Sequence, residues 1–161
     1  MRLAAVVVGV LLCASAAFAQ KPQQSARDTE AIEDCVKTAA PAGKPTSDAE
    51  RCIGIVSNPC LDDKATKSTA DMNACADRER MVWDDILNET YRNLGQKLDT
   101  GQQAKLRAMQ RAWIASRDAS CRFYWDYYQG TMASPMASAC VNRETARRAL
   151  FLLGFLLDGD K

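Results

Sequence analysis

The chain has 161 residues, seven cysteines, no histidine and a formal net charge of +1. This length suits one ordinary domain with a core of its own. A charge this close to neutral provides no global field to attract nucleic acid or an anionic membrane, so we predict no nucleic-acid partner.

The first residues have the three-part layout of a secretory signal peptide. Arg2 supplies a positive charge, an apolar run extends over residues 3–12, and small residues lead to the triplet Ala17-Phe18-Ala19. This order is typical of a segment removed on export. We therefore predict a signal peptide over residues 1–19 and an exported protein.

The predicted leader also bears on membrane attachment. Its apolar run is shorter than the roughly 20 residues that span a bilayer, so we expect no stable membrane insertion after cleavage. Cys13 leaves lipid attachment open as an alternative. Leu12 before it is not the small residue usual at such sites, and cleavage after Ala19 would remove the cysteine.

Six cysteines remain after the predicted cleavage: Cys35, Cys52, Cys60, Cys75, Cys121 and Cys140. An even number in an exported chain indicates three disulfides, for which fifteen connectivities exist. The spacings favour neighbours, which would close loops of 15 to 19 residues: Cys35 with Cys52, Cys60 with Cys75, and Cys121 with Cys140. Because C-x2-C pairs and histidines are absent, we predict no metal site.

The region that follows the predicted signal peptide is expected to begin with short helices. We predict a flexible polar arm over residues 20–28 and a short helix from about Thr29 to Ala39, ended by the prolines at 41 and 45. Ser47 and Glu50 form a capping box that would start a second short helix.

Asn58-Pro59 is expected to end that second helix. Residues 29–59 would then form a short helical extension, and residues 60–157 the main helical domain.

Helical periodicity is strongest after Ser68, which forms another capping box with Asp71. Apolar side chains recur there at three- and four-residue steps over nearly thirty residues. They are Met72, Cys75, Ala76, Val82, Trp83, Ile86, Leu87, Tyr91, Leu94 and Leu98.

A second long helix is predicted to open with Thr100 and Gln103 as its cap. Its expected inner side consists of Leu106, Met109, Trp113, Ile114, Ser116, Cys121 and Tyr124. The short turn between the two long helices predicts an antiparallel hairpin. Gly130 suits a positive φ in the following loop, and Pro135 suits the first turn of a third long helix that reaches about Leu157.

These elements predict an all-α fold. It would consist of the long antiparallel hairpin and a third long helix, with two short N-terminal helices, stapled by disulfides. No segment shows the alternation typical of a strand.

Catalytic chemistry finds little support in the sequence. Without histidine the usual base of serine and cysteine hydrolases is missing, and glycine-rich phosphate loops are absent. The adjacent carboxylates Asp84 and Asp85 would point about 100° apart on a helix, which does not suit an acid/base pair. We predict a protein that is not an enzyme and uses no cofactor; a carboxylate-based wall hydrolase is the catalytic alternative.

Two stretches of the second long helix are candidates for function. Trp113, Arg117 and Cys121 share one face, where a buried guanidinium would need a partner such as Asp118. This face either holds a polar network that links the hairpin to the third helix, or it forms a site for a ligand or a partner. The second stretch, residues 123–128, contains five aromatic residues, and a helix cannot turn all of them inward. These rings either bind a partner or cover the short N-terminal helices.

These stretches carry a resemblance to the LprI-type lysozyme inhibitor domain, a family of bacterial envelope proteins. The similarity covers roughly residues 60–150. The matching residues are Met72 to Ala76, Leu87, Asn88, Tyr91, Gln110 to Ile114, Arg117 to Ala119, Cys121, Cys140, Thr145 and Arg148. One departure lies in the loop after the hairpin, where members often carry two glycines and this chain has Gln129 before Gly130.

The resemblance implies a periplasmic or secreted bacterial protein in which Cys60 pairs with Cys75 and Cys121 with Cys140. It also implies lysozyme as the partner; the alternative is a periplasmic binding or scaffold module with another partner. The family-motif residues, which we expect to be structural, are Gln110, Trp113, Arg117, Asp118, Thr145 and Arg148. For the partner-binding site we expect Trp125, Tyr127, Tyr128 and Gly130.

Overall fold

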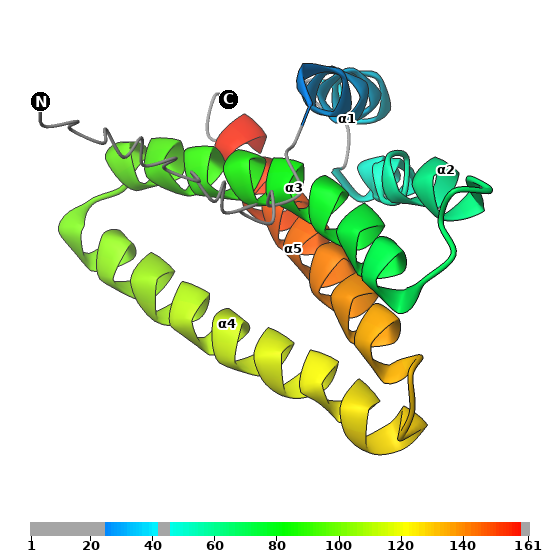
Figure 1. Ribbon diagram of the computed structural model, residues 1–161. Helices are drawn as coiled ribbons and strands as arrows, with labels where there is room; N and C mark the ends of the chain where they lie inside the picture. Colours follow the sequence, from blue (N-terminus) through cyan, green and yellow to red (C-terminus); the bar gives the residue numbers. More distant parts are fainter. Residues whose placement is uncertain (1–24, 42–45, 159–161) are drawn as a thin grey trace, which may run out of the picture.

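The computed structural model describes residues 25–41 and 46–158, and within these ranges the protein is all-α, as predicted (Figure 1). The elements are α1 (Ala26–Ala39), the 3-10 helix η1 (Thr46–Cys52), α2 (Ser57–Asp62), α3 (Thr69–Lys97), α4 (Thr100–Tyr128) and α5 (Ala133–Asp158). No described helix is long and apolar enough to cross a membrane. The predicted signal peptide, residues 1–19, lies outside the described residues.

The core forms mainly where α3 and α5 lie side by side (Figure 1). Its fully buried members include Val82 and Trp83 of α3 and Ala146 and Leu152 of α5. The helices α1, η1 and α2 pack against this pair. A short turn joins α3 to α4 as predicted, but α3 finds its main partner in α5, and α4 packs along α5 rather than along α3.

The start of the described chain differs from expectation. Helix α1 begins at Ala26 rather than Thr29, because Ser25 caps it and Asp28 completes a capping box. The prediction that Asn58-Pro59 ends a helix is wrong, since both residues lie in the first turn of α2. The missing N–H of Pro59 costs nothing there, because first-turn N–H groups have no intrahelical partner.

The capping residues predicted for α3 are correct, whereas those predicted for α4 are not. Ser68 and Asp71 form the predicted capping box of α3. Helix α4 is capped by Asp99, and Gln102 completes the box, so the predicted pair Thr100 and Gln103 is one residue out of register. The Gln103 amide instead donates to the carbonyl oxygens of Gly95 and Leu98, at 3.1 and 3.0 Å, at the end of α3.

Within the described residues, three disulfides join neighbouring elements. Cys35–Cys52 links α1 to η1, Cys60–Cys75 links α2 to α3, and Cys121–Cys140 links α4 to α5. These are the pairs that the spacings favour.

The loop between α4 and α5 uses a different residue from the one expected. Gln129, with a φ of 41°, ends α4 in the left-handed conformation, whereas Gly130 does not adopt a positive φ. The expectation for Gly130 is therefore wrong. The left-handed position falls one residue earlier, directly at the helix end, where glycine is most common.

Candidate functional site

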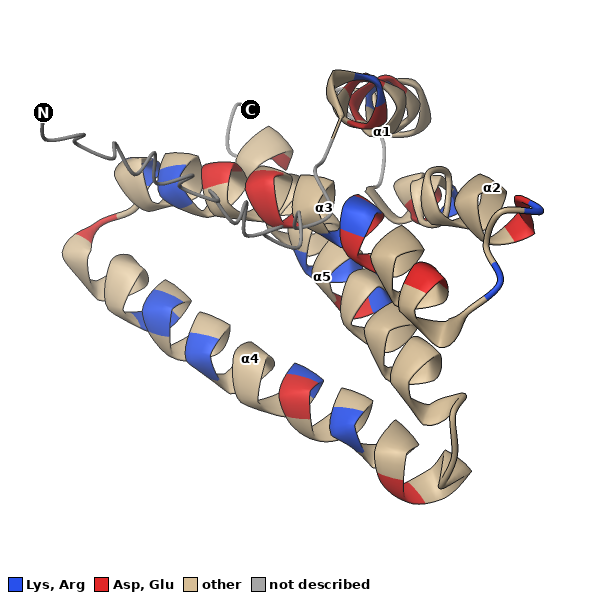
Figure 2. Cartoon of the chain, viewed as in Figure 1, with Lys and Arg blue, Asp and Glu red and all other residues tan. Residues whose placement is uncertain are grey.

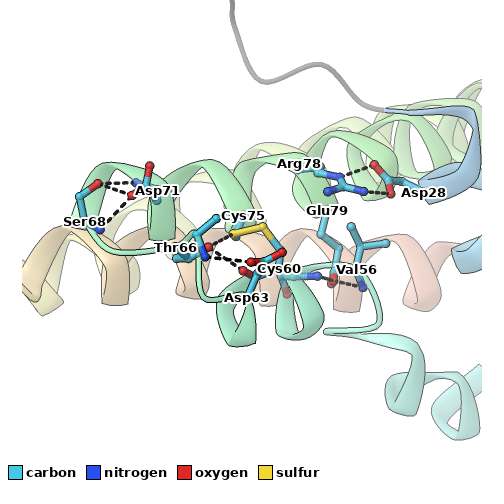
Figure 3. Close-up of a disulfide and its surroundings, with 12 residues drawn as sticks. Asp28, Val56, Cys60, Asp63, Thr66, Ser68, Asp71, Cys75, Arg78 and Glu79 are labelled. Atoms are coloured by element: carbon cyan, nitrogen blue, oxygen red, sulfur yellow. Dashed lines mark hydrogen bonds and ion pairs between the residues drawn. A yellow bond between two sulfur atoms is a disulfide. The ribbon is translucent and has the colours of Figure 1, made fainter.

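A buried carboxylate ties the N-terminal extension to the long helices. Glu79 on α3 is completely buried, and its two oxygens accept hydrogen bonds from the backbone N–H groups of Gly54, Val56 and Ser57, at 2.7 to 3.0 Å. The Trp83 indole N–H, at 3.1 Å, and the Asn142 amide, at 3.0 Å, donate to the same carboxylate. Figure 3 shows Glu79 pointing from α3 toward Val56.

The hydrogen bonds decide the ionisation of this carboxylate. Burial alone would raise the pKa of Glu79, but the N–H groups of Ser57 and Gly54 and the amide of Asn142 outweigh it and lower the pKa. Glu79 is therefore ionised at neutral pH. With all its oxygens engaged, this carboxylate serves the fold rather than a reaction.

A second carboxylate fastens α1 to α3. Arg78 donates a bidentate pair of hydrogen bonds to Asp28, the residue that also completes the cap of α1 (Figure 3). The guanidinium of Arg78 holds the pKa of Asp28 below its usual value. Neither Glu79 nor Asp28 is among the residues predicted from the sequence. A signal existed for Glu79, which falls on the same helical face as Cys75, Val82 and Trp83.

Four of the family-motif residues meet between α4 and α5 and form what we call the tryptophan cluster: Gln110, Trp113, Arg117 and Arg148. The Arg117 guanidinium lies over the Trp113 ring, 4.9 Å from its centre, and Arg148 lies 5.5 Å from the same centre. Arg148 Nε also donates to Gln110 Oε1 at 2.8 Å. The two contacts between a guanidinium and the Trp113 ring are cation–π pairs, a stable arrangement for arginines on tryptophan.

The two arginines of the cluster differ in their charge partners. Arg117 donates two hydrogen bonds to the exposed carboxylate of Asp118, at 2.8 and 2.9 Å, as the sequence suggests. Arg148 is 7% exposed, and its Nη2 has no hydrogen-bond partner among the described residues. Burial lowers the pKa of Arg148. The charge of this buried guanidinium is thus balanced by no carboxylate in the described structure.

Arg148 lines a pocket of about 390 Å³, which we call the Arg148 pocket. Its walls come from η1, α4 and α5. The lining residues are Thr46, Ser47, Glu50, Trp113, Glu144, Arg147, Arg148, Leu150 and Phe151.

Exposed apolar side chains gather where α4 ends. We call this group the aromatic end: Phe123, Trp125, Tyr127, Tyr128 and Met132, each between 43% and 69% exposed. The rings support one another, because Tyr128 lies edge-on to Tyr127, with ring centres 5.0 Å apart, and stacks on Tyr124 at 5.8 Å. The Cys121–Cys140 bridge anchors this part of α4 to α5.

Depressions flank the aromatic end. One, of about 550 Å³, is lined by Phe123, Tyr124 and Tyr127 from α4 and by Arg143 from α5. Another, of about 490 Å³, is lined by Trp125 together with Ser134 and Ser138 of α5. Large exposed rings beside hollows of this size are typical of surfaces that bind other molecules.

Other predicted residues do not join these groups. Thr145 is buried within α5, and its hydroxyl has no hydrogen-bond partner in the part of the chain that the structure describes. Ile114 and Ser116, expected on the inner side of α4, are exposed. The described residues contain no group of three acidic, cysteine or histidine side chains placed to hold a metal ion.

Charge is spread unevenly over the helices. Helix α4 carries five lysines and arginines and only two acidic residues, Asp118 and Asp126 (Figure 2). The acidic pair lies in the second half of the helix, close to the aromatic end.

Comparison with known protein families finds a match over more than half of the chain. A family model described as lysozyme inhibitor LprI matches residues 60–152. No curated protein and no solved structure matches the chain.

Proposed function

Because the chain belongs to the LprI lysozyme inhibitor family, we propose that it is an exported bacterial envelope protein that inhibits lysozyme by binding to it. Its three disulfides support the location, since such bonds form and persist outside the cytoplasm. Inhibition by binding requires a recognition surface and no catalytic group.

The aromatic end is the surface that we assign to lysozyme. The observation that carries this assignment is the exposure of four aromatic rings within six residues of one helix. Tyrosine and tryptophan dominate the energetics of protein interfaces, because they provide large, rigid contact areas. The bridge to α5 would hold these rings in place before the partner arrives, which lowers the entropy lost on binding.

Charge favours contact at this end over contact along the middle of α4. Lysozyme is a basic protein, so the lysines and arginines of α4 would repel it. Asp118 and Asp126 lie near the aromatic rings and reduce that repulsion locally.

A binding measurement tests the assignment. The double variant Trp125→Ala, Tyr127→Ala should weaken the affinity for lysozyme by about tenfold or more, because both rings lose most of their contact area. The matched control is Phe155→Ala on α5, since Phe155 is 51% exposed and Trp125 is 52% exposed. Titration calorimetry gives the affinities, and far-UV circular dichroism verifies that the helices are retained.

Turbidity of a cell-wall suspension supplies the functional readout. Slower clearing by lysozyme in the presence of the protein supports inhibition, and the double variant should restore clearing. If the wild-type protein leaves clearing unchanged, the partner is another molecule; if it clears the wall by itself, the protein is a hydrolase. If the double variant inhibits as well as Phe155→Ala does, the aromatic end is the wrong surface.

A further inference from the structure

Arg148 is a buried cation that no carboxylate pairs with among the described residues. A guanidinium offers five N–H donors, and in the described structure Arg148 makes one hydrogen bond, to Gln110, and no ion pair. The cation–π contacts with Trp113 and Phe151 occupy its faces but supply no acceptor for its N–H groups. A buried arginine normally has a carboxylate or phosphate partner.

The Arg148 pocket can accept a ligand that supplies such a partner. Its volume of about 390 Å³ lies in the range of small-molecule sites. Trp113, Leu150 and Phe151 give it an apolar wall, and Thr46 and Ser47 add hydroxyl groups.

Two carboxylates in the lining limit the charge of the ligand. Arg147 pairs with Glu50 at 3.5 Å and with Glu144 at 3.3 Å, so this arginine is already engaged. A multiply charged anion such as a phosphate would be repelled by both glutamates. These carboxylates can instead accept hydrogen bonds from hydroxyl groups of a ligand.

We propose that the Arg148 pocket binds a small sugar that carries one carboxylate, with the carboxylate on Arg148. The apolar wall suits the C–H face of the sugar ring, and the glutamates and hydroxyl groups of the lining suit its hydroxyls. The proposal does not rest on lysozyme binding.

Two sugars that differ in the carboxylate provide the test. N-acetylmuramate is N-acetylglucosamine with an added lactyl ether, and this lactyl group carries the carboxylate. Titration of the exported chain with each should give an affinity about tenfold or more higher for N-acetylmuramate, the gain expected from a charge-assisted hydrogen bond.

Variants locate the site. Arg148→Met should reduce the affinity for N-acetylmuramate to that for N-acetylglucosamine, whereas Arg111→Met removes an exposed positive charge from α4, outside the pocket, and should leave it unchanged. The midpoint of thermal unfolding of Arg148→Met should stay close to that of the wild type, because relief of a desolvated charge offsets the lost contacts with Gln110 and Trp113. Ser47→Trp fills the pocket without altering Arg148 and should abolish binding of both sugars.

Three results would overturn the proposal. They are equal affinities for the two sugars, no binding of N-acetylmuramate at millimolar concentration, and binding that survives both Arg148→Met and Ser47→Trp. Lysozyme takes no part in this experiment, so its outcome is independent of the inhibition assay.

Discussion

Glu79 connects three parts of the fold through one carboxylate: α3, which carries it, the turn before α2, and Asn142 of α5. A buried charge is costly unless hydrogen bonds compensate it, and here backbone N–H groups provide most of the compensation. Removing the charge leaves those groups facing a weaker acceptor.

Glu79→Gln should therefore lower the free energy of unfolding by about 3 kcal/mol, because its amide NH₂ group would face backbone N–H donors. Urea unfolding at pH 7 measures the loss. Glu89→Gln, the same chemical change at an exposed position of α3, is the control and should stay within about 0.5 kcal/mol of the wild type. A loss no larger than that of the control would contradict the role of Glu79.

The same variant has a defined pH dependence. The pKa of Glu79 is lower in the folded state than in the unfolded chain, so the stabilisation is present above its ordinary pKa and is lost as the pH falls through the folded value. The difference between Glu79→Gln and the wild type should thus shrink on acidification.

The sequence could not predict this site, although it predicted the helix that carries it. Periodicity places Glu79 on the buried face of α3. The backbone N–H groups that donate to its carboxylate belong to residues 54–57, however, and these reach α3 only through the tertiary fold. The contact between Gln110 and Arg148 likewise depends on how α4 and α5 are aligned. The pattern around Trp113 marked these residues without revealing that alignment.

At the level of elements, α3 and α4 have equal length, but α3 is largely covered by its neighbours whereas α4 is mostly exposed. The periodic residues of α3 are buried or half-buried as predicted, because both α5 and the N-terminal elements cover this helix. In α4 only Leu106 and Cys121 are buried, and the inner side predicted through Ile114 and Ser116 is wrong there. Periodicity shows which face is apolar but not how much of it a neighbour covers.

Helix α4 should consequently depend on its disulfide more than α3 does. The double variant Cys121→Ser, Cys140→Ser should lose about 3 kcal/mol of stability, the value that chain entropy gives for a loop of this length. Hydrogen exchange should rise in the second half of α4 before it rises in α3. In the control, Cys35→Ser with Cys52→Ser, the increase should fall on α1 and η1; equal protection of α4 in both variants would contradict the prediction.

For the whole molecule, the near balance of charge bears on how it would meet the basic partner that we propose. Lysines and arginines number 21 and acidic residues 20, so long-range attraction contributes little to the encounter. Binding that rests on aromatic contacts is insensitive to screening, whereas binding driven by opposite net charges weakens steeply with salt.

The affinity for lysozyme should therefore change less than about threefold between 50 and 300 mM sodium chloride, concentrations between which screening becomes much stronger. Titration calorimetry is the suitable measurement, because the turbidity assay also reports the salt dependence of the enzyme. A tenfold loss would indicate that a charged patch, rather than the aromatic end, provides the contact.

The Cys121–Cys140 bridge has a further consequence wherever proteases reach the protein. It spans the exposed loop after Gln129, so the bond encloses the segment of chain beside the aromatic end. A single cut in that loop would produce two polypeptides that remain covalently joined, with α4 still fastened to α5. The aromatic end could thus outlast a break in the backbone next to it.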